Sequence, residues 1–218
     1  MKKGRKMKKK TLIIFIVILL LGVCVYKKMS STNIKHYNSN VVILDAGHGG
    51  SDTGATESGI NEKDINLNAV KMIGNYLEEF GIEVIYTRND DQRLCNEKFE
   101  DLKLRAEMSK KYKAEYYVSI HVNDYEEVVS GFEIYINDDN YARELAKSIG
   151  KEFDKLNYSE NRGIKDGTHL RVLRLNTSPA ILIELGYINS KDINYLINNN
   201  KLEKLCKAIS EGIIERVK

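Results

Sequence analysis

The chain has 218 residues, 30% charged and 42% hydrophobic, which fits one globular domain with an appendage and excludes collagen-like, disordered and disulfide-scaffold proteins. The formal net charge is +3, but nine of the 34 basic residues and none of the 31 acidic residues lie within residues 1–28. The other 25 basic residues leave the body with a net charge of about −6. An acidic body without a Lys/Arg stripe argues against nucleic-acid binding, because clustered cations supply most of the affinity for phosphates.

The N-terminus predicts a membrane segment. Seven basic residues precede an apolar run from Leu12 to Tyr26, and two lysines follow it. We expect residues 1–10 to be a basic cytoplasmic segment, 11–26 a signal anchor or signal peptide, and 27–40 a polar tether, with the body outside the cytoplasm. An anchor is favoured over a cleaved signal, which would secrete the body, because no small-x-small cleavage site follows the run. Val23 before Cys24 argues against a lipoprotein signal.

From Val41 onward, short apolar runs alternate with stretches of helical spacing, the pattern of parallel strands covered by helices on both faces. We predict a single α/β domain over residues 41–218, with a central, mostly parallel sheet of about six strands. The runs that predict strands are Val41–Leu44, Ile82–Tyr86, Tyr116–Ile120, Phe132–Ile136, Leu170–Leu173 and Ala180–Ile183. Helices are expected over residues 65–80, 99–113, 141–156 and 202–213. His36 is expected to be solvated in the tether, and the three cysteines show no CxxC pair that would indicate a zinc site.

Two histidines follow predicted strands. The first strand leads into Asp45-Ala-Gly-His-Gly-Gly-Ser-Asp-Thr-Gly-Ala55, and the third ends in Tyr117-Val-Ser-Ile-His-Val-Asn-Asp124. Ligands of open α/β sheets bind outside the carboxyl ends of strands, which is where His48 and His121 fall. Either residue alone is more often a satisfied polar group, but two at neighbouring strand ends indicate a metal site. His169 precedes a predicted strand and is expected to be a turn residue.

Two glutamates satisfy the same positional test. Glu62 opens the helix after the glycine loop, where an ordinary acidic residue favoured by the helix dipole is an equally good interpretation. Glu184 closes the last apolar strand, where a carboxylate is costly to bury without a partner, so a functional role is favoured. Two histidines and a glutamate would leave a fourth metal position open, as in catalytic zinc sites, with Glu184 as the base for amide hydrolysis. Ferrous iron is the rival metal, and zinc is preferred.

These residues give the sequence a resemblance to the zinc-dependent N-acetylmuramoyl-L-alanine amidases of bacterial cell-wall metabolism, over residues 41–218. The matching blocks, in order, are residues 45–55, Asn61–Leu67, Thr87–Arg88, Ser119–Asn123, Arg171–Arg174 and Ile183–Asn189. The resemblance implies that His48, Glu62 and His121 bind zinc, that Glu184 is catalytic, and that peptidoglycan is the substrate. Ala46 and Thr53 replace prolines that the family usually has, without removing a ligand.

The compact, anchored layout is similar to that of spore-cortex amidases, which start muramic-δ-lactam formation and permit germination. An acidic domain gains little electrostatic steering toward an anionic wall, so a partner protein that localises or activates the enzyme is also expected. Two alternatives stay open at this point. One is a non-catalytic, membrane-tethered peptidoglycan-binding or regulatory protein, and the other is a soluble peptidase.

Overall fold

The computed structural model describes residues 14, 16, 18 and 34–217, and residues from Ile34 onward form one compact unit. Within these residues, no helix combines the length and the apolar character needed to cross a bilayer. The predicted basic segment 1–10 lies outside the described residues. Of the predicted apolar segment 11–26, only Ile14, Ile16 and Ile18 are described, and all three are helical.

The domain is built on a six-stranded sheet in the order β4-β1-β5-β8-β6-β7. Its strands are β1 (Val41–Ala46), β4 (Glu83–Tyr86), β5 (Tyr116–Asn123), β6 (Phe132–Ile136), β7 (Asn161–Asp166) and β8 (Ala180–Tyr187). Strands β4, β1, β5 and β8 are mutually parallel, whereas β6 is antiparallel to β8 and β7 is parallel to β6. A separate hairpin joins β2 (Thr56–Glu57) to β3 (Ile60–Asn61). The predicted single α/β domain with a mostly parallel sheet is confirmed.

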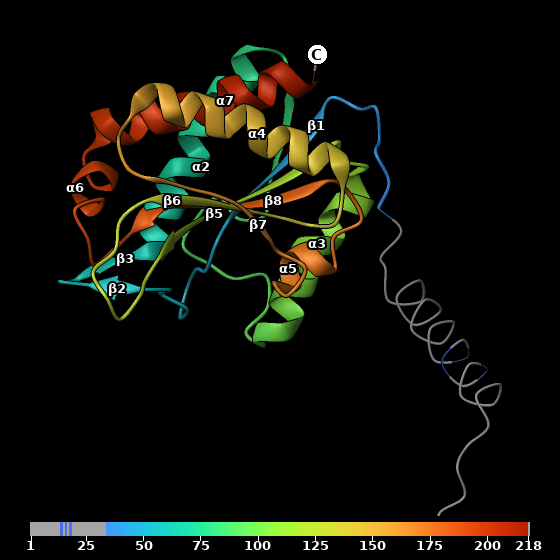
Figure 1. Ribbon diagram of the computed structural model, residues 1–218, viewed down its shortest axis with the longest axis horizontal. Helices are drawn as coiled ribbons and strands as arrows, with labels where there is room; N and C mark the ends of the chain where they lie inside the picture. The colour runs from blue at the N-terminus through green and yellow to red at the C-terminus, as the bar shows by residue number, and fades with distance from the viewer. Residues whose placement is uncertain (1–13, 15, 17, 19–33, 218) are drawn as a thin grey trace, which may run out of the picture. The chain divides into compact units, whose positions relative to one another are not determined.

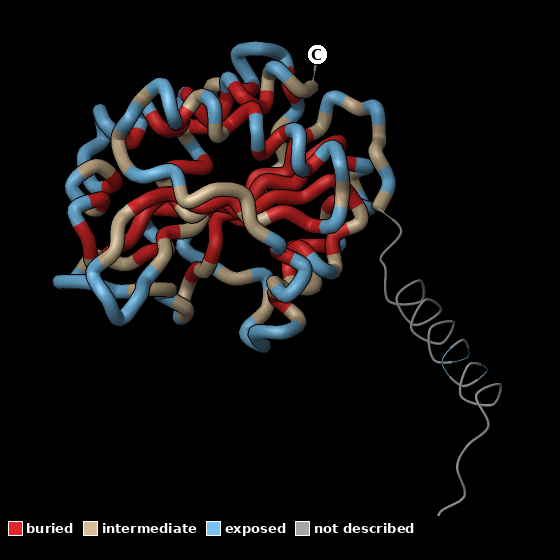
Figure 2. Tube along the Cα trace, viewed as in Figure 1, coloured by how far each residue is buried: buried red, intermediate tan, exposed pale blue. Residues whose placement is uncertain are grey.

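Helices cover both faces of the sheet (Figure 1). One layer contains α2 (Glu62–Glu79), α4 (Asn140–Leu156) and α7 (Asn199–Val217), and the other contains α3 (Lys98–Tyr112) and the short α5 (Arg171–Arg174). The short α6 (Ile193–Leu196) precedes α7. A separate cluster of buried apolar side chains lies on each side of the sheet. The central strands are buried along almost their whole length (Figure 2), as expected for parallel strands covered on both faces.

The strand predicted at Leu170–Leu173 is wrong. Residues Arg171–Arg174 form the helical turn α5, and the sixth strand is β7, which the sequence does not indicate. The burial pattern explains both errors. Strand β7 has no fully buried residue because it lies at the sheet edge, so it has no apolar run, whereas Val172 and Leu173 are buried from a helix.

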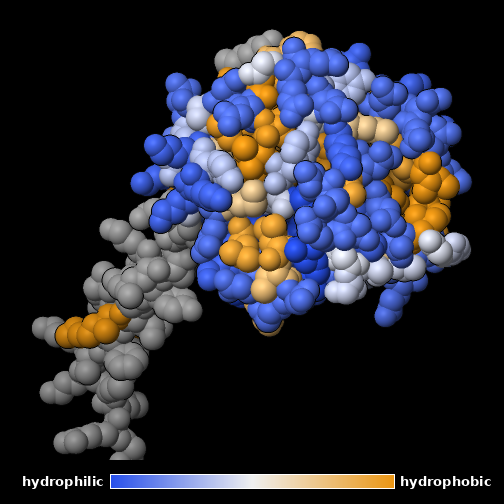
Figure 3. Space-filling model, turned by 180° about the vertical axis from the view of Figure 1, so that it is seen from behind, coloured by the Kyte–Doolittle hydropathy of each residue, from blue (hydrophilic) through white to orange (hydrophobic). Residues whose placement is uncertain are grey.

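Residues 34–40, predicted as the end of the tether, contact the domain. The amide of Lys35 donates to the carbonyl of Thr177 (2.7 Å). The expectation that His36 is solvated is wrong, because its ring stacks on Tyr141 with centroids 3.9 Å apart, and Nε2 lies 3.5 Å from Glu115. A flat imidazole thus finds an aromatic face and a buried carboxylate on the domain surface. On the rear face, exposed apolar side chains form separate patches within a hydrophilic surface (Figure 3).

Candidate metal centre and active site

Polar side chains gather on one face of the sheet, near the edge at which β1, β5 and β8 end. Strand register pairs Asp45 with Ser119 and His121 with Glu184. On β6, which runs in the opposite direction, Glu133 pairs with Glu184. Alternate residues of a strand share a face, so all five lie on the face that α3 and α5 cover. The site is therefore built across four adjacent strands.

The loop after β1 carries His48 with φ at 64°, an uncommon conformation for a residue with a side chain. Two arginines bind the backbone carbonyls of this loop. Arg88 donates from Nε to Ala46 (3.0 Å), and Arg105 donates from Nη2 to His48 (2.8 Å). These charge-assisted bonds hold the His48 backbone in a defined position.

Two glycines of the loop leave room for the side chains of the site. A Cβ atom on Gly47 would lie 2.3 Å from Cε1 of His121, and one on Gly54 would lie 2.4 Å from Oε2 of Glu62. Gly54 also has φ at +66°, which glycine adopts more readily than other residues. The glycine-rich loop, a weak motif by itself, thus has a steric role in forming the cluster.

The three residues predicted as metal ligands lie together. Glu62 is the first residue of α2, and its Oε2 is 3.1 Å from Nε2 of His48 while its Oε1 is 2.8 Å from Nδ1 of His121. One ligand atom from each residue lies within 4.8 Å of the other two. Two imidazoles and one carboxylate are a donor set that zinc accepts in catalytic sites. This chemistry fits a metal ion, and the cluster is within reach of Glu184 on the adjacent strand.

The environment fixes the charge and orientation of these ligands. Burial opposes ionisation of Glu62, but hydrogen bonds and charges from His121 and His48 lower its pKa well below the usual range. Burial also disfavours the charged form of His48, yet Glu62 and Asp52 raise its pKa above the ordinary value. Nδ1 of His48 lies at ion-pair distance, 3.0 Å, from Oδ1 of Asp52, so a carboxylate flanks this ring on one side while Nε2 points to the cluster. Metal-binding histidines usually have such a partner on their second nitrogen.

Glu184 lies next to the cluster but belongs to none of its hydrogen bonds. Its Oε2 is buried and has no hydrogen-bond partner among the described residues. Burial, followed by the negative charges of Glu62 and Glu133, raises the pKa of Glu184 well above its usual value. A buried carboxylate without a partner is costly, which indicates a role in binding or proton transfer rather than in packing.

Beneath the cluster lies an ionic network that the sequence reasoning missed. Asp45 is 2% exposed and accepts from Arg105 Nη1 (2.8 Å), Thr87 Oγ1 (2.6 Å) and Ser119 Oγ (2.6 Å). Burial would raise the pKa of Asp45, but Arg105 and the two hydroxyls lower it well below the ordinary value. The test that selected Glu184, a carboxylate in an apolar strand, would also have found Asp45 and Glu133.

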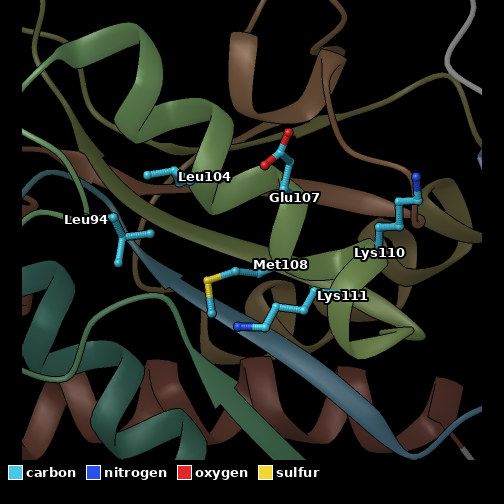
Figure 4. Close-up of a pocket in the computed structure, with 6 residues that line it drawn as sticks. All are labelled: Leu94, Leu104, Glu107, Met108, Lys110 and Lys111. Carbon is cyan, nitrogen blue, oxygen red and sulfur yellow. The ribbon is translucent and has the colours of Figure 1, made fainter.

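The candidate metal cluster lies outside a wide groove on the domain surface. That groove, of about 700 Å³, lies along α3 and contains none of the cluster residues (Figure 4); its lining residues are Leu94, Leu104, Glu107, Met108, Lys110 and Lys111. A smaller cavity of about 50 Å³ is lined by His48 and His121, with Arg93 and Lys98 also on its wall. His169 is not one of the clustered residues; it lies in a turn, as predicted, with its ring centroid 6.0 Å from that of Tyr135.

Comparison with known proteins identifies the family of this chain. Residues 42–215 match the Amidase_3 family, described as N-acetylmuramoyl-L-alanine amidase. The chain is 35% identical over 176 residues to the uncharacterized protein YqiI of Bacillus subtilis, covering 79% of this chain and 82% of YqiI. It is 31% identical to the germination-specific N-acetylmuramoyl-L-alanine amidase of B. subtilis, covering 81% of this chain and 79% of that protein.

A solved structure agrees with this assignment. The CwlD amidase from Clostridioides difficile, solved in complex with the GerS lipoprotein, has a TM-score of 0.77 against this fold, with 33% sequence identity; the match covers 82% of this chain and 98% of that chain. The family match covers the sheet except for its first residue, Val41, and its range includes His48, Glu62, His121 and Glu184. The chain belongs to the family of N-acetylmuramoyl-L-alanine amidases.

Proposed function

We propose that this peptidoglycan amidase depends on zinc, with His48, Glu62 and His121 holding the ion and Glu184 acting as the catalytic base. The observation that carries the proposal is the register of β5 and β8, which places Glu184 directly opposite His121. The nitrogen and oxygen donors of the cluster thus lie next to the Glu184 carboxylate, which has a buried oxygen without a hydrogen-bond partner. The low pKa of Glu62 suits a ligand, because a carboxylate binds a metal in its ionised form.

The bond cleaved would join the lactyl group of N-acetylmuramic acid to the L-alanine of the stem peptide. Zinc bound at the cluster would lower the pKa of a water molecule and polarise the amide carbonyl. Glu184 would take the proton from the attacking water and deliver it to the nitrogen that leaves with L-alanine. Its raised pKa favours this second transfer, since a carboxylate with a low pKa would be a poor proton donor.

Two variants separate metal binding from catalysis. Glu62→Ala should lose zinc and activity, whereas Glu184→Gln should keep one zinc per chain and lose activity. Zinc is measured by elemental mass spectrometry, and activity by mass spectrometry of the new lactyl and L-alanine termini in digested peptidoglycan. Zinc-loaded wild-type protein that binds cell walls without cutting this bond would instead support the non-catalytic alternative.

We also propose that residues 1–10, 11–26 and 27–40 are a cytoplasmic segment, a membrane anchor and a tether, which hold the catalytic domain, residues 41–218, outside the cytoplasm. The end of this tether, residues 34–40, lies against the domain. The support is the sequence pattern of basic residues around an apolar run. Fractionation of cells that express the full chain tests this organisation: the protein should stay in the membrane fraction with its N-terminal residues intact. Release of a shortened chain into the medium would contradict anchoring and support a cleaved signal.

A role in spore-cortex remodelling is the biological setting that we propose. It is supported by the germination-specific amidase among the relatives and by the CwlD structure, whose complex with the GerS lipoprotein also supports a partner protein here. Spores of a deletion strain should then lack muramic-δ-lactam in muropeptide analysis. Normal muramic-δ-lactam in those spores would refute this role without affecting the amidase assignment.

A further inference from the structure

Glu133 is a buried carboxylate next to the site, and it is neither a proposed metal ligand nor the proposed base. It is 2% exposed and stands directly opposite Glu184 in the antiparallel register of β6 and β8. Side chains paired in this way have Cβ atoms about 5 Å apart on the same face of a sheet. The surroundings of Glu133 are therefore part of the wall next to the catalytic base.

Four side chains meet at the Glu133 carboxylate. Oε1 accepts from the Tyr187 hydroxyl (2.7 Å) and lies 2.9 Å from Nε of Arg162 and 2.6 Å from Nζ of Lys165, and Oε2 accepts from the Tyr135 hydroxyl (2.7 Å). Arg162 also lies over the Tyr187 ring and Lys165 over the Tyr135 ring, at 5.6 and 5.8 Å from the centroids. Each cation is thus fixed by a carboxylate and by an aromatic face.

This cluster contains more positive charge than its buried carboxylate needs. Two tyrosine hydroxyls and one cation would already satisfy Glu133, yet two cations are present, and their side chains are 31% and 37% exposed. In the described part of the chain, Arg162 donates only from Nε, so the Nη1 and Nη2 groups have no hydrogen-bond acceptor. A planar pair of N–H donors is the arrangement that binds a carboxylate with two parallel hydrogen bonds.

The position of the cations is as informative as their charge. Strands β6 and β7 begin at the edge where β5 and β8 carry His121 and Glu184, because β6 runs antiparallel to β8. A peptide whose first amide bond lies at Glu184 would extend over neighbouring strands. Two half-exposed cations share one carboxylate here, and although the charge of Glu160 also acts on Arg162, they offer a fixed place at which an anionic part of the substrate would lie.

We propose that Arg162 and Lys165, held in place by Glu133, bind a free carboxylate of the substrate's peptide and so select acidic over amidated peptides. The inference rests on the proposed function and adds a specificity determinant to it. Glu133 acts as a positioning residue, and the two cations contact the substrate.

The test compares three soluble N-acetylmuramoyl tripeptides: one with free carboxylates at the second and third residues, and two in which one or the other is a carboxamide. Wild-type enzyme should lose about tenfold in kcat/KM, or about 1.4 kcal/mol, on one of the two amides. The loss should fall mainly on KM, because the carboxylate is bound equally in the ground state and the transition state. Arg162→Gln and Lys165→Gln should cleave all three substrates at nearly equal efficiency, while the exposed α7 control Lys204→Gln should keep the wild-type preference.

Binding gives a second measurement that does not need turnover. Glu184→Gln should bind peptidoglycan sacculi more tightly than the same sacculi amidated with carbodiimide and ammonia, and adding Arg162→Gln should remove the difference. Equal treatment of acid and amide substrates by the wild type, or a preference that survives Arg162→Gln and Lys165→Gln, would overturn the subsite. Failure of wild-type enzyme to cut sacculi and all tripeptides would refute the proposed function, and the binding comparison would still decide on the subsite.

Discussion

Arg105 gives the sharpest prediction, because one buried side chain supports both the sheet and the loop of His48. It is 2% exposed and donates to Asp45, Asp101, and the carbonyls of Ala46 and His48, over distances of 2.7–2.8 Å. Arg105→Gln would remove the positive charge that both buried carboxylates share. Removing one partner of a buried ion pair costs about 3–5 kcal/mol, and we expect a loss of stability in that range.

The same helix offers a matched control. Lys103 forms an ion pair with Glu100 at 2.9 Å, but the two side chains are 44% and 45% exposed. Lys103→Gln should therefore cost less than about 1 kcal/mol. Urea denaturation of each purified variant, followed by far-UV circular dichroism at pH 7, measures the difference in the free energy of unfolding. The comparison requires that the variants have the same dependence of this free energy on urea concentration (m value). Equal losses in the two variants, or a loss below about 1 kcal/mol for Arg105→Gln, would refute the reasoning.

The pH dependence of the same pair supplies a further check. The pKa of Asp45 is lowered in the folded state, so its contribution to stability is present above the ordinary aspartate pKa, about 4, and is lost as the pH falls. Arg105 is the main source of that lowering. Wild-type stability should thus fall more steeply below about pH 4 than that of Arg105→Gln. Parallel curves for the two proteins would show that the pair does not carry this dependence.

Two further predictions concern the glycine-rich loop after β1 and Glu115, which lies next to His36 in the segment before β1. Gly47→Ala would place a Cβ atom 2.3 Å from the His121 ring and should abolish zinc binding, measured by elemental mass spectrometry. Gly150→Ala is the control, because there is open space around its Cβ. It should leave the zinc content unchanged and stabilise α4 by about 0.5–1 kcal/mol. Burial raises the pKa of Glu115 to about 7, so its charged form destabilises the fold as the pH rises from about 4.5 to 7. Glu115→Gln should flatten this decline in urea midpoints between pH 5 and 8, and a decline as steep as in the wild type would show that Glu115 does not cause it.

Much of the fold is predictable from the sequence because strands that are buried on both faces consist of runs of apolar residues. Strand β6 has the predicted bounds, Phe132–Ile136. The edge strand β7 is not predictable in this way, since Asn161–Asp166 contains only one apolar residue, Ile164. The run Leu170–Leu173 is apolar for a different reason, namely that a helical turn buries Val172 and Leu173 against the sheet.

In the candidate site, too, some residues could be placed from the sequence and others could not. Strand ends and the start of a helix place His48, His121 and Glu62, so their meeting follows from parallel topology once the strands are known. Glu133 could not be placed next to Glu184, because nothing in the sequence reveals that β6 is antiparallel to β8. The functions of Arg88 and Arg105 were equally hidden, since they bind backbone carbonyls that a pattern of residue types does not show.

The carboxylate of Glu62 has a thermodynamic consequence beyond its role as a ligand. It accepts hydrogen bonds from the Ala55 amide in the loop, the Val122 amide on β5 and the Asn66 side chain on α2. One group thus fastens three segments of the chain to each other, and occupancy of the cluster is linked to global unfolding. An ion that binds only the assembled cluster depletes the unfolded population by mass action, so chelation should lower the melting temperature of the whole domain and not merely loosen a loop.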